Sequence, residues 1–251
     1  MTQLYQTKAR AVIQTLLQSA RDVGRRTAMV FALVLFASSG LWAQNVSVLS
    51  TGSPANDLDY ATVNAAFAAI NAGTHTGRVT IALNGNTTEP NTPTALADSG
   101  VGSARYSSVI MYPTADAVTI SVGTTFTNNR GVLELNGADN VTIDGDNPNT
   151  AGINRNLIIS IPTATTTTNA VAHIRLMGGT TASDLPANRN AAFQNISIRN
   201  IRFEGFYGTL SSNGSFGIIT TGSTWSLFGA PTFCSNITVS CLLYTSDAAD
   251  E

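Results

Sequence analysis

The feature that most constrains the fold is a recurring four-residue pattern: asparagine, a β-branched residue, a hydroxyl residue and a second β-branched residue. It occurs at 140–143, 195–198 and 236–239. Alternation of apolar and polar residues is typical of a strand that is buried on one face. Asparagine and glycine are residues at which a chain turns. The pattern therefore predicts short strands that bend sharply at asparagine and glycine and recur along the chain.

Similar short segments follow one another after residue 78, separated by Gly, Asn, Asp and Thr. They start too close together to leave room for helices between parallel partners. Two architectures remain open: an antiparallel sandwich and a parallel β-helix, in which each coil stacks on the last and the terminal coil needs a cap. The predicted strands are 79–83, 109–112, 118–122, 132–135, 141–143, 157–161, 172–176, 196–198, 201–203, 216–219 and 237–239.

One helix is predicted, over Tyr60–Ala72. Its apolar residues recur at helical spacing, with small alanines between them. Asp57 or Asp59 is expected to cap its start, and Gly73 is expected to end it. The helix lies where a β-helix needs a cap over the open end of its apolar core.

The first 43 residues are interpreted as a secretory signal peptide with a long basic leader. Five basic residues precede a ten-residue apolar segment at 28–37, and Ala43 is a suitable residue before a cleavage point. The competing interpretation is a membrane anchor, but the apolar segment is shorter than the ~20 residues of a spanning helix. We expect cleavage after Ala43, and no membrane span in the mature chain.

The last eleven residues, 241–251, resemble the in-frame translation of an adapter used to prepare sequencing libraries. We therefore expect them to be non-native and to pack on nothing, with the natural chain truncated near Ser240 and no Cys234–Cys241 disulfide. The predicted organisation is a signal peptide (1–43), a cap region with one helix (44–78), β-helix coils (79–240) and the artefactual tail (241–251).

Composition excludes several classes of protein. The chain carries 13 Lys and Arg against 15 Asp and Glu, a net charge of −2, and only 11% of its residues are charged. Collagen, coiled coils and basic nucleic-acid binders do not have this composition. No lysine follows Arg26, and Thr and Asn are abundant. This suits a fold whose exposed faces are strands.

The segment Asn136–Gly145 resembles the coil motif of right-handed parallel β-helix proteins of the pectin-lyase-like type. The longer arrangement is similar to large secreted surface proteins of Bacteroidota-type bacteria, through the signal end Trp42–Gln44, the helix segment Ala65–Gly73 and Tyr112-Pro113. This resemblance implies an all-β, right-handed parallel β-helix and a secreted or cell-surface location. It also implies type IX secretion, whose C-terminal sorting domain this sequence does not contain.

One segment is a candidate calcium site. Asp144, Asp146, Asn147 and Asn149 follow a predicted strand, and carboxylate and amide oxygens are the ligands that Ca²⁺ prefers. The spacing is not that of an EF-hand. The alternative is an Asx-rich turn between coils.

No catalytic residue is assigned. Glu134, Asp144 and Glu204 lie near strands, where a pair of carboxylates facing one groove would serve sugar hydrolysis. We expect these acids to be solvated instead. His173 is expected to point outward with Arg175, and His75 to lie in a turn.

The function that the sequence favours is an exported, non-catalytic β-helix segment of a bacterial cell-surface or extracellular protein, adhesive or in contact with glycans. Its expected partner is an extracellular polysaccharide or cell-surface glycan, with no nucleic acid and no cofactor other than the candidate calcium. The alternative is a polysaccharide lyase or glycoside hydrolase whose active coils are partly lost by truncation.

Overall fold

A computed structural model describes residues 44–52, 57–123, 130–162, 171–178, 193–205, 215–221 and 234–245. The chain divides into two compact units, Met1–Ala43 and Gln44–Glu251, and all of the described residues belong to the second. The predicted signal peptide lies outside the described residues, as does the end of the predicted tail from residue 246 onward.

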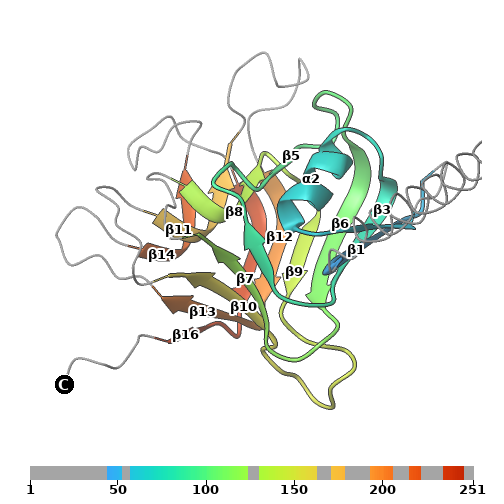
Figure 1. Ribbon diagram of the computed structural model, residues 1–251. Coiled ribbons are helices and arrows are strands. Elements are labelled where there is room, and N and C mark those ends of the chain that lie inside the picture. Colours follow the sequence, from blue (N-terminus) through green and yellow to red (C-terminus); the bar gives the residue numbers. More distant parts are fainter. Residues whose placement is uncertain are drawn as a thin grey trace, which may run out of the picture. The chain divides into compact units, whose positions relative to one another are not determined.

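The second unit is mostly β, with one described helix, α2 (Val63–Asn71) (Figure 1). Every strand that the sequence predicted is present. The strands are β1 (Val46–Ser50), β2 (Asp57–Tyr60), β3 (Thr76–Leu83), β4 (Thr87–Glu89), β5 (Ala95–Ala97), β6 (Arg105–Pro113), β7 (Val118–Val122), β8 (Arg130–Asn136), β9 (Val141–Asp144), β10 (Leu157–Ile161), β11 (Val171–Met177), β12 (Phe193–Arg199), β13 (Ile201–Gly205), β14 (Ser215–Thr221), β15 (Cys234–Ser240) and β16 (Leu243–Thr245).

The strands form three sheets that the chain visits in turn. The strand orders are β15-β12-β9-β6-β3-β1-β2, β16-β13-β10-β7-β4 and β14-β11-β8-β5, so from β3 onward every third strand is a hydrogen-bonded neighbour. Within the series of strands from β3 to β16, all of these strand pairings are parallel. Among the described strands, antiparallel strand pairing is confined to β1, with β2 and with β3, and an isolated antiparallel bridge joins Ala97 to Gly137. The antiparallel sandwich is therefore wrong, and the chain stacks one three-strand coil on another.

The register places like residues above one another in the core. Val109, Val141, Ile196 and Ile237 are successive partners in the seven-stranded sheet. Leu157 pairs with Val118 and Ile201 in the five-stranded sheet. The prediction that the inward residues of these strands are buried is confirmed, because each of the following is exposed by 2% or less: Val141, Ile143, Ile196, Ile198, Ile201 and Phe203.

The helix begins differently from the prediction. Thr62 is the N-cap, and its Oγ1 accepts a hydrogen bond from the Ala65 amide (3.1 Å). Asp57 and Asp59, the expected caps, lie in β2. They are exposed there and pair with β1, which fixes them in extended backbone. Gly73 follows the helix at φ +78°, a conformation that glycine adopts without strain.

A buried carboxylate also caps this helix. Glu89 Oε1 accepts from the Val63 amide (3.1 Å) and Oε2 from the Asn64 amide (2.7 Å). Burial raises the pKa of Glu89, and these donors oppose that effect. Below the cap, α2 buries Val63, Ala66, Phe67 and Ile70 in the core. It contacts β4, β5 and β6, which belong to three different sheets.

Part of the predicted tail packs on the fold. β16 (Leu243–Thr245) pairs with β13, and the Cys241 carbonyl accepts from Arg155 Nε (2.7 Å). The prediction that residues 241–251 pack on nothing is therefore wrong for these residues, because the apolar Leu243 and Tyr244 suit a further strand. Cys234 and Cys241 are exposed free thiols.

Candidate functional site

The outer face of the seven-stranded sheet gathers the polar side chains best placed to meet a ligand. Along β9 and β12, inward residues are buried while the alternate residues are partly exposed. The register pairs Thr142 with Ser197 and Asp144 with Arg199. Tyr112 follows Met111, the partner of Ile143, so it stands level with Asp144. Hydroxyls, a carboxylate, a guanidinium and an aromatic ring therefore share one face.

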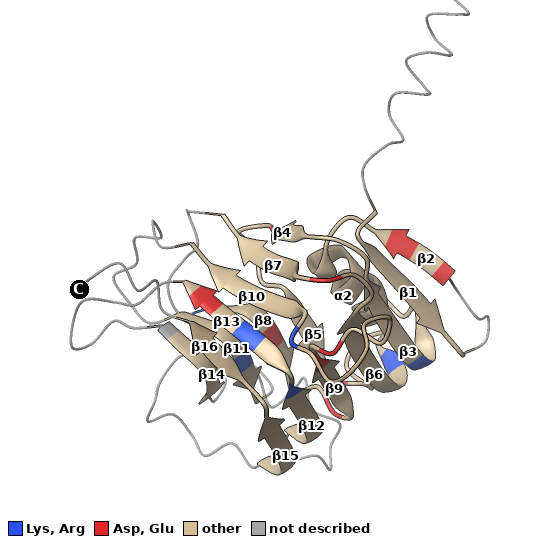
Figure 2. Cartoon of the chain, turned by 90° about the horizontal axis from the view of Figure 1, so that it is seen from below, with Lys and Arg blue, Asp and Glu red and all other residues tan. Residues whose placement is uncertain are grey.

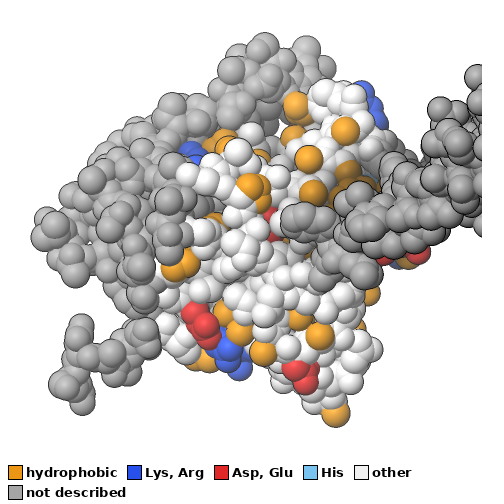
Figure 3. Space-filling model, in the orientation of Figure 1, with side chains coloured by type: hydrophobic (Ala, Val, Ile, Leu, Met, Phe, Trp, Pro, Cys, Tyr) orange, Lys and Arg blue, Asp and Glu red, His pale blue; other side chains and the backbone are white. Residues whose placement is uncertain are grey.

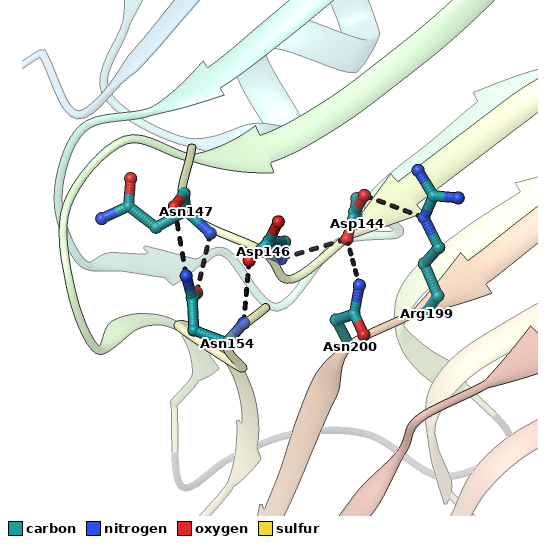
Figure 4. A network of polar contacts seen from close by, with 6 residues as sticks. All are labelled: Asp144, Asp146, Asn147, Asn154, Arg199 and Asn200. Carbon is teal, nitrogen blue, oxygen red and sulfur yellow. Dashed lines mark hydrogen bonds and ion pairs between the residues drawn. The ribbon is translucent and has the colours of Figure 1, made fainter. Parts of the chain in front are cut away.

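An ion pair lies on this face at the C-terminal ends of β9 and β12. Arg199 Nε lies 2.8 Å from Asp144 Oδ2, and Asp144 Oδ1 accepts from the Asn200 amide group at 2.8 Å (Figure 4). Gly145 permits this arrangement, because a Cβ there would stand 1.8 Å from the Asn200 carbonyl oxygen. Asn200 itself has φ +57°. The half-exposed Arg199 guanidinium is thus oriented while it remains accessible.

A second network orders the loop between β9 and β10. Asp116 Oδ1 accepts hydrogen bonds from Asn147 Nδ2 (2.8 Å), Asn156 Nδ2 (2.7 Å) and the Thr150 hydroxyl. The bonds from Thr150 and Asn147 lower the pKa of Asp116. This exposed carboxylate therefore ties the loop to the turn before β7.

Of the candidate calcium ligands, Asp144 ends β9 and the other three lie in this loop; protein donors already contact side-chain oxygens of Asp144, Asp146 and Asn147. Asp144 Oδ1 also accepts from the Asp146 amide, and Asp146 Oδ1 accepts from the Asn154 amide (2.8 Å). Asn147 Oδ1 accepts from the Asn149 amide (3.0 Å), and Asn149 Nδ2 donates to the Thr114 carbonyl. Within the described part of the chain, no three His, Cys, Asp or Glu residues form a metal-binding group. The contacts favour the Asx-rich turn, and calcium binding stays a prediction.

Each of the three acids considered for catalysis lies next to an arginine. Glu134 Oε1 is 3.6 Å from Arg175 Nη1, Asp144 pairs with Arg199, and Glu204 Oε1 is 2.6 Å from Arg202 Nε. Sugar hydrolysis needs two carboxylates that face one groove. At these three positions the structure instead places each carboxylate beside an arginine. Figure 2 shows how sparsely charged residues are spread over the strands.

Two of these residues are buried, contrary to expectation. Glu134 and Arg175 are only 3% and 6% exposed. Glu134 Oε1 also accepts from the Gly131 amide (3.0 Å), and Arg175 Nε donates to the Thr221 hydroxyl (2.9 Å). Burial lowers the pKa of Arg175, and Glu134 opposes that effect. The expectation of solvated side chains fails here because the pair satisfies its own charges inside the protein.

The prediction that His173 points outward is also wrong. His173 is fully buried, with its ring 5.1 Å from the Phe203 ring. Its Nε2 lies 2.9 Å from the Glu204 carbonyl oxygen and its Nδ1 3.1 Å from that of Phe216. Burial lowers the pKa of His173, while these carbonyls oppose that effect. Both partners come from the next coil, 31 and 43 residues along the chain, so no local pattern could reveal them.

His75 lies in a bend before β3, as expected, but it too is buried. Its Nε2 is 2.8 Å from the Tyr60 hydroxyl, and its Nδ1 is 3.3 Å from the hydroxyl of the buried Ser50. Burial lowers the pKa of His75 and raises that of Tyr60. These contacts link β1 and β2 to the bend before β3.

Comparison with protein-family models, with curated proteins and with solved structures found no significant match. No helix among the described residues has the length and hydropathy needed to cross a membrane. Among the described residues, the face shown in Figure 3 presents mostly uncharged polar side chains and backbone, with apolar side chains scattered among them.

Proposed function

We propose that the chain is an exported, non-catalytic segment of a bacterial cell-surface or extracellular protein, folded as a right-handed parallel β-helix, that contacts extracellular polysaccharide or cell-surface glycan. The three parallel sheets visited in turn support the β-helix. The right-handed winding follows from the preference of parallel crossover connections, about 98% of which have this hand.

The outer face of the seven-stranded sheet is the observation that carries glycan contact. Sugars offer hydroxyls that both donate and accept hydrogen bonds, and apolar faces that pack on aromatic rings. Thr142, Ser197 and the Asp144–Arg199 pair supply donors and acceptors, and the half-buried Tyr112 supplies a ring. The strand spacing of ~4.8 Å places these groups at regular intervals, which suits a polymer with a repeating unit.

The acid–arginine pairs support binding without catalysis. A general acid or base must reach the reacting atoms in a suitable protonation state. Asp144 already accepts from Arg199 and Asn200, and Glu134 is buried beside Arg175. Such acids position an arginine better than they transfer protons.

Export is part of the same proposal and rests on the leader. If residues 1–43 are a signal peptide, intact-mass analysis of exported protein should give a chain that begins at Gln44. A mature product that retains the apolar segment at 28–37 would contradict export by cleavage. Attachment through type IX secretion rests on the Bacteroidota-type resemblance alone.

Binding is tested by measuring retention of the chain on a panel of immobilised pectic, alginate-like and neutral polysaccharides. Arg199→Ala and Tyr112→Ala are expected to lower retention at least several-fold on any polysaccharide that binds the parent chain. Thr119→Ala is the matched control, since Thr119 is a partly exposed strand residue of the five-stranded sheet. Equal loss in all three variants, or no retention of the parent chain, would contradict the proposal.

A further inference from the structure

A row of side chains crosses the outer face of the seven-stranded sheet from β2 to β12. Residues that pair across neighbouring strands lie on the same face of a sheet, so the strand register defines the row. Ser47 on β1 pairs with Asp59 on one side and with Ala82 on the other. Ala82 pairs with Tyr112, which stands level with the Asp144–Arg199 pair. The Tyr112 row therefore consists of Asp59, Ser47, Ala82, Tyr112, Asp144 and Arg199.

The charge along this row is negative. Its two carboxylates, Asp59 and Asp144, accompany one guanidinium, and Arg199 already lies 2.8 Å from Asp144. Asp57 adds a third carboxylate beside the row, because it pairs with Leu49, an outward residue of β1 that is 51% exposed. Both acids of β2 are exposed and appear as the two red segments of that strand in Figure 2.

The donor that holds Asp59 is neutral. The Ser47 hydroxyl donates to Asp59 Oδ1 and accepts a hydrogen bond from Asn84 Nδ2 (2.7 Å). The Thr114 hydroxyl in turn donates to Asn84 Oδ1 (2.7 Å). These groups orient the Asp59 carboxylate and bring no positive charge to it.

The other basic residue on the outer face of β3 lies too far away to change this balance. Arg78 comes four residues before Ala82 on the same strand, which is about 13 Å along an extended chain. Exposed charges separated by more than a Debye length, about 8 Å at physiological salt, are largely screened from one another. The field at the β2 end of the Tyr112 row is therefore set by Asp57 and Asp59.

The middle of the row is uncharged and partly apolar. Tyr112 is half-buried, and its partner Ala82 has only a methyl side chain. Ile110, two residues before Tyr112 on the same face, is also half-buried. A small neighbour leaves room beside the Tyr112 ring, where the apolar face of a sugar can pack.

We propose that the polysaccharide bound by this face is neutral, and that Asp57 and Asp59 are specificity-determining residues that exclude anionic chains. This inference rests on the glycan contact proposed above. A polyuronate that packs on Tyr112 and extends toward β2 brings its carboxylates beside those two acids, and Asp144 already balances the charge of Arg199. A neutral chain makes the same hydroxyl and ring contacts without this repulsion. Specificity is commonly obtained by a repulsive element directed against the wrong partner.

Two matched pairs of immobilised polysaccharides test this preference, because the members of each pair share a backbone and differ in charge. One pair is polygalacturonate and its fully methyl-esterified form, and the other is carboxymethyl cellulose and hydroxyethyl cellulose. In whichever pair retains the chain, the neutral member is expected to retain it at least several-fold more strongly at low salt. Added salt should reduce the difference by screening the repulsion.

An acid-to-amide substitution on β2 tests the two residues themselves. Asp59→Asn keeps the oxygen that accepts from Ser47 and removes one negative charge. It is expected to raise retention on the anionic member relative to the neutral member several-fold, and Asp57→Asn/Asp59→Asn should raise it further. Glu204→Gln is the matched control, since it removes the same charge from the five-stranded sheet and should leave the ratio unchanged.

The possible failures are distinguishable. Stronger retention on the anionic member, with the same dependence on Tyr112 and Arg199, would overturn the neutral preference and leave the proposed glycan contact standing. Retention on no polysaccharide would contradict both. An equal rise in the ratio from Asp59→Asn and Glu204→Gln would assign the effect to net charge and overturn the role of Asp57 and Asp59.

Discussion

Asn195 donates a hydrogen bond from Nδ2 to Oδ1 of Asn140, 2.8 Å away on the neighbouring coil. Asn236 repeats this contact with Asn195 at 2.9 Å. All three residues have φ near +55°, between +55° and +57°, a region that asparagine tolerates better than most residues. The sequence repeat is therefore a ladder of side-chain amides on three neighbouring strands of the seven-stranded sheet: Asn140 immediately precedes β9, and Asn195 and Asn236 lie within β12 and β15.

Substituting Asn195, the middle residue of this ladder, should separate two contributions to stability, that of the left-handed backbone conformation and that of the side-chain amide contacts. Asn195→Ala is expected to lower the free energy of unfolding by about 2–4 kcal/mol, since it combines backbone strain of about 1–3 kcal/mol with the lost amide contacts. Asn195→Gly keeps the positive φ at little steric cost and should lose less. Chemical denaturation of both variants measures the difference. Equal losses would show that the left-handed backbone is not what selects asparagine here.

The buried Glu134–Arg175 pair should depend strongly on both partners. Removing one partner of a buried ion pair typically costs about 3–5 kcal/mol because the other charge is left uncompensated. Glu134→Gln should lower the free energy of unfolding more than Arg175→Met does. It removes the carboxylate and leaves Arg130 and Arg175, which repel each other. The double variant Glu134→Leu/Arg175→Met is expected to be more stable than either single variant, Glu134→Gln or Arg175→Met.

The partly exposed Arg202–Glu204 pair provides the control for this prediction. Arg202→Met should change stability by no more than about 1 kcal/mol, as for other exposed pairs. If Glu134→Gln lowers the free energy of unfolding no more than Arg202→Met in the same denaturation experiment, then the Glu134–Arg175 pair is not buried as described.

The stability of the first turn of α2 should depend on Glu89, which lies 25 residues after Asn64 in the sequence. Glu89 accepts from the first two amides of the helix. Glu89→Ala leaves both without this acceptor and is expected to cost about 1–3 kcal/mol. Thr62→Ala removes the local cap and should cost about 1 kcal/mol. Thermal unfolding ranks the two variants, and a larger loss from Thr62→Ala would contradict the role of Glu89.

His173 should make the fold less stable in mild acid. Burial lowers its pKa, so the unfolded chain binds more protons than the folded chain below the ordinary histidine value of about 6.5. The free energy of unfolding therefore falls as the pH drops from about 6.5 through the folded-state pKa. His173→Phe removes this contribution, and the stability advantage of the parent chain over the variant should shrink between neutral pH and about pH 5.

His75→Phe is needed as a companion, because burial lowers the pKa of His75 as well. Each variant is compared with the parent chain by denaturant unfolding at several pH values. An advantage over His173→Phe that is constant or grows toward acid would contradict the direction of the His173 pKa shift.

The strands were predictable because their signal is local. Alternation in segments such as Val141–Ile143 directly reflects one buried face, and stacking of coils repeats the pattern. The choice between a sandwich and parallel sheets was not local, because it depends on which distant strands pair. The three-residue strands β4 and β5 are too short to show a period, and β2 has no buried alternation.

The buried polar residues were the hardest to predict. His173 alternates correctly for an outward position, yet it lies beside Phe203 and meets carbonyl oxygens from two strands of the next coil, β13 and β14. Glu134 and Arg175 are 41 residues apart, and only the register of β8 and β11 reveals that they are partners. The Asp144–Arg199 pair became recognisable in the same way. Long-range register, which sequence alone does not provide, assembles the candidate site.

Binding without turnover is tested most directly by incubating the chain with the polysaccharides that retain it, with and without Ca²⁺, and measuring the products. We predict that no reducing ends or unsaturated products form above a heat-inactivated control in either condition. Products that appear with the parent chain and are lost in Asp144→Ala or Glu204→Ala would contradict this account and identify a polysaccharide lyase or glycoside hydrolase.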